Sequence, residues 1–135
     1  MTFIDTNFFL RFFLKDIRKQ YLEAKVVFQR GARGEEDLIT SIIVVFEVFW
    51  VLNSAYHYSQ SQLSKIIEMI LQMKFIYIDE RSVLEEALRL YDSTNLSLGD
   101  CYNLAFAQHQ EVSGFKTFDV KLNKQFEKLV GKKKS

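Results

Sequence analysis

Residues 38–52, LITSIIVVFEVFWVL, pass from a short apolar run into a longer segment that is apolar on every side. The run at 38–40 is predicted to be a buried strand. From Ser41 the apolar density continues to Tyr58, and a helix this apolar is not expected to lie on the surface. Short apolar runs alternate with longer amphipathic segments on both sides of this stretch, which indicates the α/β class.

The alternation predicts four strands and seven helices. The strands are expected at residues 2–4, 38–40, 75–78 and 115–118, and the helices at residues 8–15, 18–33, 41–58, 59–73, 80–94, 97–112 and 120–128. Strands that are short, apolar and separated by helices pair in parallel and are covered on both faces. The sequence therefore predicts a doubly wound, three-layer α/β/α sandwich with a short parallel central sheet.

The composition is that of a globular chain without a global charge. Of the 135 residues, 48% are hydrophobic and 26% are charged, which excludes a disordered chain. The net charge of +1 does not indicate a nucleic-acid partner, so any such sign must be local. The single cysteine, Cys101, excludes an internal disulfide and favours a reducing cytoplasm. No apolar stretch reaches the ~20 residues that a membrane helix needs.

The chain is expected to form one domain, because it has no repeat, low-complexity tract or Gly/Ser linker. We place this domain at residues 1–130. A lysine-rich tail at residues 131–135 follows it and is expected to fray.

Acidic residues follow two of the predicted strands. Ligands of doubly wound sheets bind beyond the carboxyl ends of the strands, and Asp5 and Asp119 stand there, as do Thr40 and Ser41. Each acid also has a simpler interpretation as a helix N-cap. Asp100, three residues after Ser97 in a segment that resembles a capping box, has the same alternative.

Glu47 is different, because it lies in the middle of the apolar helix, where it cannot act as a cap. No Lys or Arg stands three or four residues away. An ionised carboxylate in apolar surroundings is costly unless it is paired or binds a metal. A salt bridge to a distant arginine is one alternative, and a metal ligand or functional acid is the favoured interpretation.

Together the four carboxylates predict a site for a divalent cation. Carboxylates that converge repel each other, and a bound cation removes that penalty. A site of oxygen ligands without Cys or His suits Mg²⁺ or Mn²⁺ rather than Zn²⁺. Such ions polarise phosphoryl oxygens and lower the pKa of water, so phosphodiester hydrolysis is the expected reaction class.

Four segments of the chain resemble those of PIN-domain proteins, in the same order and at similar spacing. Among these proteins the chain is most similar to the VapC-type ribonuclease toxins of toxin–antitoxin pairs. The similarity extends over residues 1 to about 130, and the segments are FIDTN at 3–7, FEVFWVL at 46–52, LGDCYN at 98–103 and KTFD at 116–119.

The resemblance implies an endoribonuclease that uses Mg²⁺ or Mn²⁺, forms homodimers and is inhibited by a cognate antitoxin. It also implies roles for individual residues. Asp5, Glu47 and Asp100 match conserved metal ligands, and Asp119 matches a more variable fourth acid. Asn7 matches the residue that orients the first acid, and Thr117 matches a hydroxyl position near the metal. The chain departs from many relatives in having no proline and no basic composition.

Two further features point to partners. Arg11 and Lys15 share a helix face with Asn7 and are candidates for RNA phosphate contacts, although a solvated face is the favoured interpretation. Two of the predicted helices carry large apolar side chains on nearly every side. One chain of this size could not bury all of them, so they predict a homodimer, an antitoxin groove or both. These residues are Phe8, Phe9, Phe12, Phe13, Phe46, Phe49, Trp50 and Tyr56.

Two other functions are compatible with parts of this pattern. A phosphatase of the haloacid-dehalogenase type would use Asp5 as its nucleophile, but Asn7 stands where that chemistry needs a second Asp. A non-catalytic PIN-like module that binds RNA or protein would not need all four acids. Fold alone does not decide between these functions.

Overall fold

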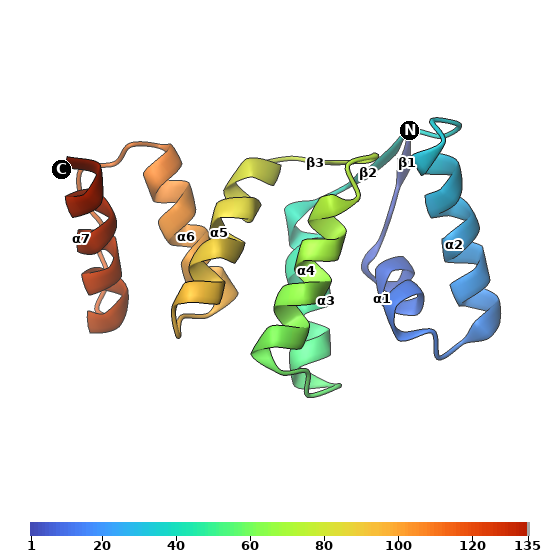
Figure 1. Cartoon of the computed structure of the whole chain (residues 1–135), viewed down its shortest axis with the longest axis horizontal. Coiled ribbons are helices and arrows are strands. Elements are labelled where there is room, and N and C mark those ends of the chain that lie inside the picture. The colour runs from blue at the N-terminus through green and yellow to red at the C-terminus, as the bar shows by residue number, and fades with distance from the viewer. Residues whose placement is uncertain (135) are drawn as a thin grey trace. The chain divides into compact units, whose positions relative to one another are not determined.

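The computed structural model describes residues 1–134, and the chain forms two compact units. Unit 1 is Met1–Arg81 and unit 2 is Ser82–Ser135. Unit 1 contains the strands and the first four helices, and unit 2 is helical in its described part (Figure 1). In the part of the chain that the structure describes, no helix has the length and apolarity needed to cross a membrane.

Unit 1 is built on a short, entirely parallel sheet, as the alternation of apolar runs predicts. The strand order is β1-β2-β3, and Thr2, Leu38 and Ile76 are aligned across it. The strands are β1 (Thr2–Phe3), β2 (Leu38–Thr40) and β3 (Ile76–Ile78). Leu38, Ile76 and Ile78 are buried, whereas Phe3 and Tyr77, which are in register on the alternate positions, are exposed. The expectation that both faces of the sheet are covered is therefore wrong at these positions. These strands follow one another in chain order, so the described sheet has no point at which the order reverses.

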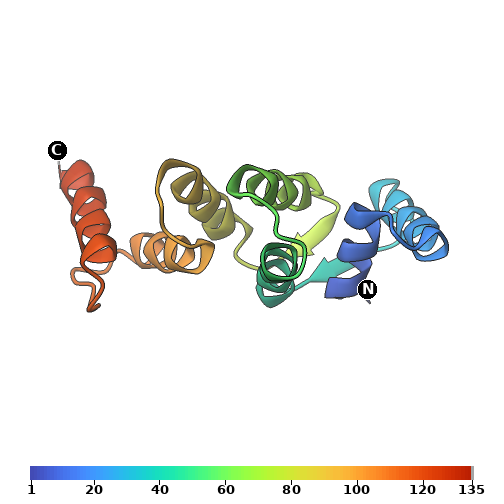
Figure 2. The same cartoon turned by 90° about the horizontal axis from the view of Figure 1, so that it is seen from below.

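The helices of unit 1 pack as two neighbouring pairs, α1 with α2 and α3 with α4 (Figure 2). They are α1 (Thr6–Leu14), α2 (Arg18–Ala32), α3 (Ile42–Ser54) and α4 (Gln60–Gln72). Ser41 caps α3 by accepting a hydrogen bond from the backbone N–H of Val44, and Ser59 and Gln62 form a reciprocal capping box at α4. Helix α3 ends four residues before the expected Tyr58, and His57 adopts a left-handed backbone with φ of 55°.

The aromatic side chains of α1 are packed inside unit 1. The Phe12 ring lies 5.0 Å from that of Phe28 and 5.9 Å from that of Tyr21, measured between centroids, and Phe9 lies 5.5 Å from Phe28. Gly31 allows α2 to come close to β2, since an added Cβ would stand 2.5 Å from Leu38 Cδ1. Most of the aromatic side chains of α1 that were expected to be exposed therefore pack against α2.

Unit 2 contains three helices in its described part. They are α5 (Arg81–Ser93, which begins at the last residue of unit 1), α6 (Leu98–His109) and α7 (Val120–Lys134). Leu84, Leu98 and Leu104 are completely buried. Helices α6 and α7 run in the same direction, so their N-terminal ends lie at the same end of the unit (Figure 1).

The prediction of a fourth strand at residues 115–118 is wrong, because the described structure has an irregular segment there. Side chains of this segment contact α7 and the residue that caps it. The Phe115 ring stacks on Phe126 of α7 at 5.1 Å, and the backbone N–H of Asp119 donates to Thr117 Oγ1. Helix α7 begins at the expected residue but continues to Lys134 rather than ending at Lys128.

Candidate functional site

Asp5 follows β1 on a backbone that β2 holds in place. The Ile4 N–H donates to the Ile39 carbonyl oxygen at 2.8 Å, and the buried Thr40 hydroxyl donates to the Ile4 carbonyl oxygen at 2.7 Å. Both bonds fix the residue before Asp5, so the end of β1 is tied to the end of β2. The strand-end position expected for Asp5 is present in unit 1.

The carboxylate of Asp5 does not serve as a helix cap. Asp5 occupies the N-cap position of α1 with an extended backbone, but its side chain accepts no capping hydrogen bond. The side chain is exposed. The simpler capping interpretation is therefore wrong for this residue, and its oxygens are available to a ligand.

Glu47 is oriented by a residue next to Asp5. The Thr6 hydroxyl donates to Glu47 Oε2 at 2.7 Å, and Thr6 itself is buried. This hydrogen bond joins the first turn of α1 to the middle of α3. Two of the four predicted acids therefore belong to one connected part of unit 1.

The premise that Glu47 is surrounded by apolar side chains is wrong, because its side chain is exposed. Helix α3 turns Val44, Val48 and Leu52 inward. Its outer face carries Ile43 and Trp50 together with Glu47, and Trp50 is 66% exposed. An apolar segment of a sequence does not specify which face of a helix is buried when both faces are apolar.

Asp100 lies half-buried in the first turn of α6. Its backbone N–H donates to Ser97 Oγ at 3.1 Å, which confirms Ser97 as the cap. Its carboxylate stands near the N-terminal end of the helix, where a negative charge is favourable. The next residue, Cys101, is a buried free thiol, and burial raises the pKa of Cys101, with a further contribution from the Asp100 charge.

Asp119 is the one acid of the four for which the capping interpretation is correct. Its Oδ1 accepts a hydrogen bond from the Leu122 N–H at 3.0 Å, at the start of α7. Thr117 Oγ1 accepts a hydrogen bond from the Asp119 N–H at 3.0 Å, so Thr117 helps to position the backbone of Asp119. Asp119 is exposed.

The donor set fits Mg²⁺ or Mn²⁺ by its chemistry, since all four acids offer only oxygen. Asp5 and Glu47 belong to unit 1, and Asp100 and Asp119 belong to unit 2. Among the residues that the structure describes, no group of three or more His, Cys, Asp or Glu side chains is placed to hold a metal ion. Neither unit alone supplies more than two of the four predicted ligands.

The cationic candidates of α1 have partners inside the chain. Arg11 Nη1 lies 2.9 Å from Asp16 Oδ2, and Lys15 Nζ lies 5.5 Å from the centroid of the Tyr21 ring. These contacts favour a structural role for both residues over phosphate binding. A groove of about 430 Å³ beside them is lined by Asn7, Phe8, Arg11, Ile17, Gln20 and Glu23.

Thr6 is the site residue whose role the sequence reasoning missed. It lies within the FIDTN segment, but nothing in the local pattern shows that its hydroxyl reaches residue 47. Asn7 is exposed, and its side chain forms no hydrogen bond with Asp5 within the described residues.

A family model described as PIN domain matches residues 2–127 of the chain. This chain belongs to the PIN-domain family. The match agrees with the short parallel sheet and the helices around it, and it confirms the predicted α/β fold class, the three-layer α/β/α type of PIN domains.

PIN domains are in general nucleases that bind RNA and use divalent metal ions, so the family supports a nuclease at the level of class. It does not support the haloacid-dehalogenase alternative. No curated protein and no solved structure matches this PIN-domain chain.

Proposed function

We propose that this chain is a Mg²⁺- or Mn²⁺-dependent endoribonuclease and the VapC-type toxin of a toxin–antitoxin pair. Residues 1–130 act as the nuclease domain, and residues 131–135 are a lysine-rich tail. The proposal rests on membership of the PIN family together with the state of Asp5, an exposed strand-end carboxylate that caps no helix.

Each acid has a distinct part in this proposal. Asp5, Glu47 and Asp100 are the metal ligands, and Asp119 contributes when RNA is bound. Thr6 keeps one oxygen of Glu47 hydrogen-bonded, which fixes the direction of the other. Thr117 and the start of α7 orient Asp119 in the same manner, because one of its oxygens is used as a cap.

The expected reaction is in-line attack of water on a phosphorus atom of the RNA backbone. A divalent ion held by these carboxylates would polarise a phosphoryl oxygen and lower the pKa of the attacking water. One carboxylate accepts a proton from that water. The bond from phosphorus to the 3′ oxygen breaks and that oxygen takes up a proton from solvent, which leaves a 5′-phosphate on one fragment and a 3′-hydroxyl on the other.

Cleavage of a labelled RNA by the purified chain tests the proposal. We expect cleavage with Mg²⁺ or Mn²⁺, none with a chelator, and none with Asp5→Asn or Asp100→Asn, which keep side-chain size but remove a charge. Asp37→Asn is the matched control, because Asp37 is an exposed acid of unit 1 outside the proposed site. Cleavage that persists in both site variants would rule out the proposal.

We also propose a homodimer and an antitoxin partner in the cytoplasm. Trp50 and Tyr56 of the aromatic set are exposed, unlike the packed rings of α1, and they are the residues most suited to an interface. A free buried thiol at Cys101 suits a reducing compartment. Light scattering that gives the mass of a monomer at micromolar concentration would contradict the dimer.

A further inference from the structure

The exposed face of α7 carries a row of lysines. Lys121, Lys124 and Lys128 are three and four residues apart, so they lie along one side of the helix. All three side chains are exposed, whereas Leu122 and Phe126 on another side are buried. The row therefore faces solvent along at least two turns.

Helix stability does not account for this row. Lys121 lies in the first turn, where the helix dipole disfavours a cation, and no acidic residue is present in that turn. Lys124 and Lys128 are four residues apart and repel each other mildly, and the exposed Glu127, three residues after Lys124, offsets part of this repulsion. Within the described structure none of the three lysines forms an ion pair. A negatively charged partner would relieve all of these costs.

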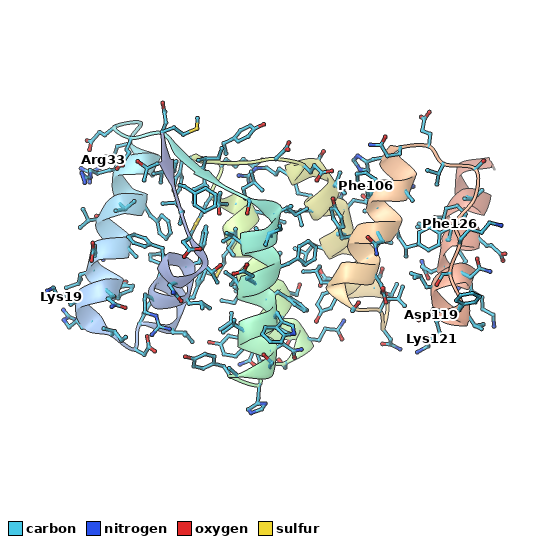
Figure 3. The ribbon with its side chains drawn as sticks, turned by 180° about the vertical axis from the view of Figure 1, so that it is seen from behind. Lys19, Arg33, Phe106, Asp119, Lys121 and Phe126 are labelled. Atoms are coloured by element: carbon cyan, nitrogen blue, oxygen red, sulfur yellow. The ribbon has the colours of Figure 1, made fainter. Side chains whose placement is uncertain are left out.

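An aromatic ring stands at the N-terminal end of the row. The Phe118 side chain is fully exposed, at 107% of its reference area, and it immediately precedes Asp119. Two hydrogen bonds hold this turn, from the Asp119 N–H to Thr117 Oγ1 and from the Leu122 N–H to Asp119 Oδ1. Figure 3 shows Asp119 and Lys121 together at this end of α7. Phe118 is thus presented to solvent by a well-bonded turn.

We propose that Phe118, Lys121, Lys124 and Lys128 form a binding track for single-stranded RNA, here named the α7 track. A base stacks on Phe118 and the phosphates follow the lysines. Base–aromatic stacking tolerates any sequence, and lysine–phosphate contacts release counterions. The bases of a duplex are stacked on each other, so the ring selects single strands. The inference rests on the proposed ribonuclease function, and it puts the stacked base beside Asp119.

Exposed basic residues of α2 serve as the comparison, although they do not form a row along one side of that helix. Lys19, Lys25 and Arg30 are exposed there, and Figure 3 shows Lys19 on this helix. The exposed apolar residues between them are Leu22 and Val26. Aliphatic side chains offer no aromatic face to a base, so α2 has charge without a stacking platform.

Fluorescence anisotropy with a short labelled oligouridine tests the α7 track on the full chain, with a chelator present so that the RNA stays intact. Replacing the three α7 lysines by Gln should lower the slope of log affinity against log salt by about 2. Phe118→Ala should raise Kd by about 5- to 160-fold, and Phe118→Trp should keep the affinity of the wild type. Replacing Lys19, Lys25 and Arg30 by Gln removes the same charge and should have the smaller effect on the slope.

Several outcomes would overturn the track. These are unchanged binding by the Phe118→Ala variant or the α7 triple variant, equal losses in the α2 and α7 triple variants, and equal dependence of duplex RNA on Phe118. If the α7 variants differ from the wild type in mass by light scattering but bind RNA equally well, the surface is a contact between chains instead. Metal-dependent cleavage by the wild type that accompanies any of these results would leave the proposed nuclease intact. Absence of both binding and cleavage would overturn both proposals.

Discussion

At the scale of single residues, the proposed site depends on hydroxyls that hold backbone and carboxylate in place. Thr40 fixes the backbone before Asp5, and Thr6 fixes Glu47. Both threonines are buried. The Thr40 bond is shielded from water, so its loss leaves a buried carbonyl oxygen poorly satisfied, whereas the Thr6 bond is partly buried because it ends on the exposed Glu47. The positions of Asp5 and Glu47 therefore depend on these two threonines.

Replacing Thr6 by Val keeps the shape of the side chain but removes the donor to Glu47. We expect the free energy of unfolding to fall by about 1 kcal/mol and RNA cleavage to fall with it. Urea unfolding and cleavage rates measure the two effects. Thr6→Ser restores the hydroxyl and should recover most of the cleavage, and an equally low rate in that variant would show that the hydrogen bond is irrelevant.

Cys101 gives a prediction for the effect of pH. Burial raises the pKa of the Cys101 thiol, although the Thr94 hydrogen bond opposes this. The folded state then holds its proton to higher pH than the unfolded state. Stability is therefore full below the pKa of the unfolded thiol, and it falls as pH rises from about 8.5 through the higher folded pKa.

Urea unfolding at neutral and alkaline pH measures this loss, and Cys101→Ala is the comparison. Tyr91 contributes in the same direction, because burial raises its pKa, with smaller contributions from the charges of Asp92 and Cys101. The variant keeps Tyr91 and removes only the smallest of these causes. The wild type should lose more stability than the variant as pH rises. Equal losses in the two proteins would contradict the assignment.

At the scale of elements, Asp119 has both a structural and a proposed catalytic role. It caps α7, so Asp119→Ala should lower the free energy of unfolding by about 1 kcal/mol and also reduce cleavage. Asp119→Ser keeps a capping oxygen but removes the charge. We expect the Ser variant to retain its stability, measured by thermal unfolding, and to lose cleavage. Full cleavage by the Ser variant would limit Asp119 to its role as a cap.

The helices and the first three strands could be predicted from the sequence because each is decided by local pattern. Ser41, Ser59 and Ser97 begin helices as their chemistry requires. The segment at 115–118 has the apolar pattern of a strand, but a sheet also needs a partner, and Phe115 stacks on Phe126 instead. Pairing is a long-range property that the pattern does not contain.

The same distinction applies to the site. The position of Asp5 at a strand end follows from local pattern and is correct. The exposure of Glu47 depends on how α3 is rotated against its neighbours, and its hydrogen bond joins residues 41 positions apart. Asp5 and Asp119 look alike in sequence, yet only Asp119 is a cap. Side-chain hydrogen bonds at helix starts are decided by small differences in geometry.

At the scale of the whole molecule, the proposed metal-dependent function uses two acids from each unit. Net charge does not help to identify this function, because +1 over 135 residues is close to neutral. The features that indicate a function are local: Asp5 caps no helix, Glu47 is held by a hydrogen bond, and α7 carries a row of lysines. We propose that the metal-dependent function needs acids from both units, Asp5 and Glu47 from one and Asp100 and Asp119 from the other.

Calorimetric titration with Mn²⁺ tests this claim most directly, on the wild type, Asp5→Asn in unit 1 and Asp100→Asn in unit 2. Loss of an outer-shell partner of a metal site weakens binding by about 10- to 100-fold, so loss of a ligand should weaken it at least as much. We expect Mn²⁺ binding by the wild type and by Asp37→Asn, with at least about tenfold weaker binding by both site variants. Wild-type affinity in either site variant would contradict it.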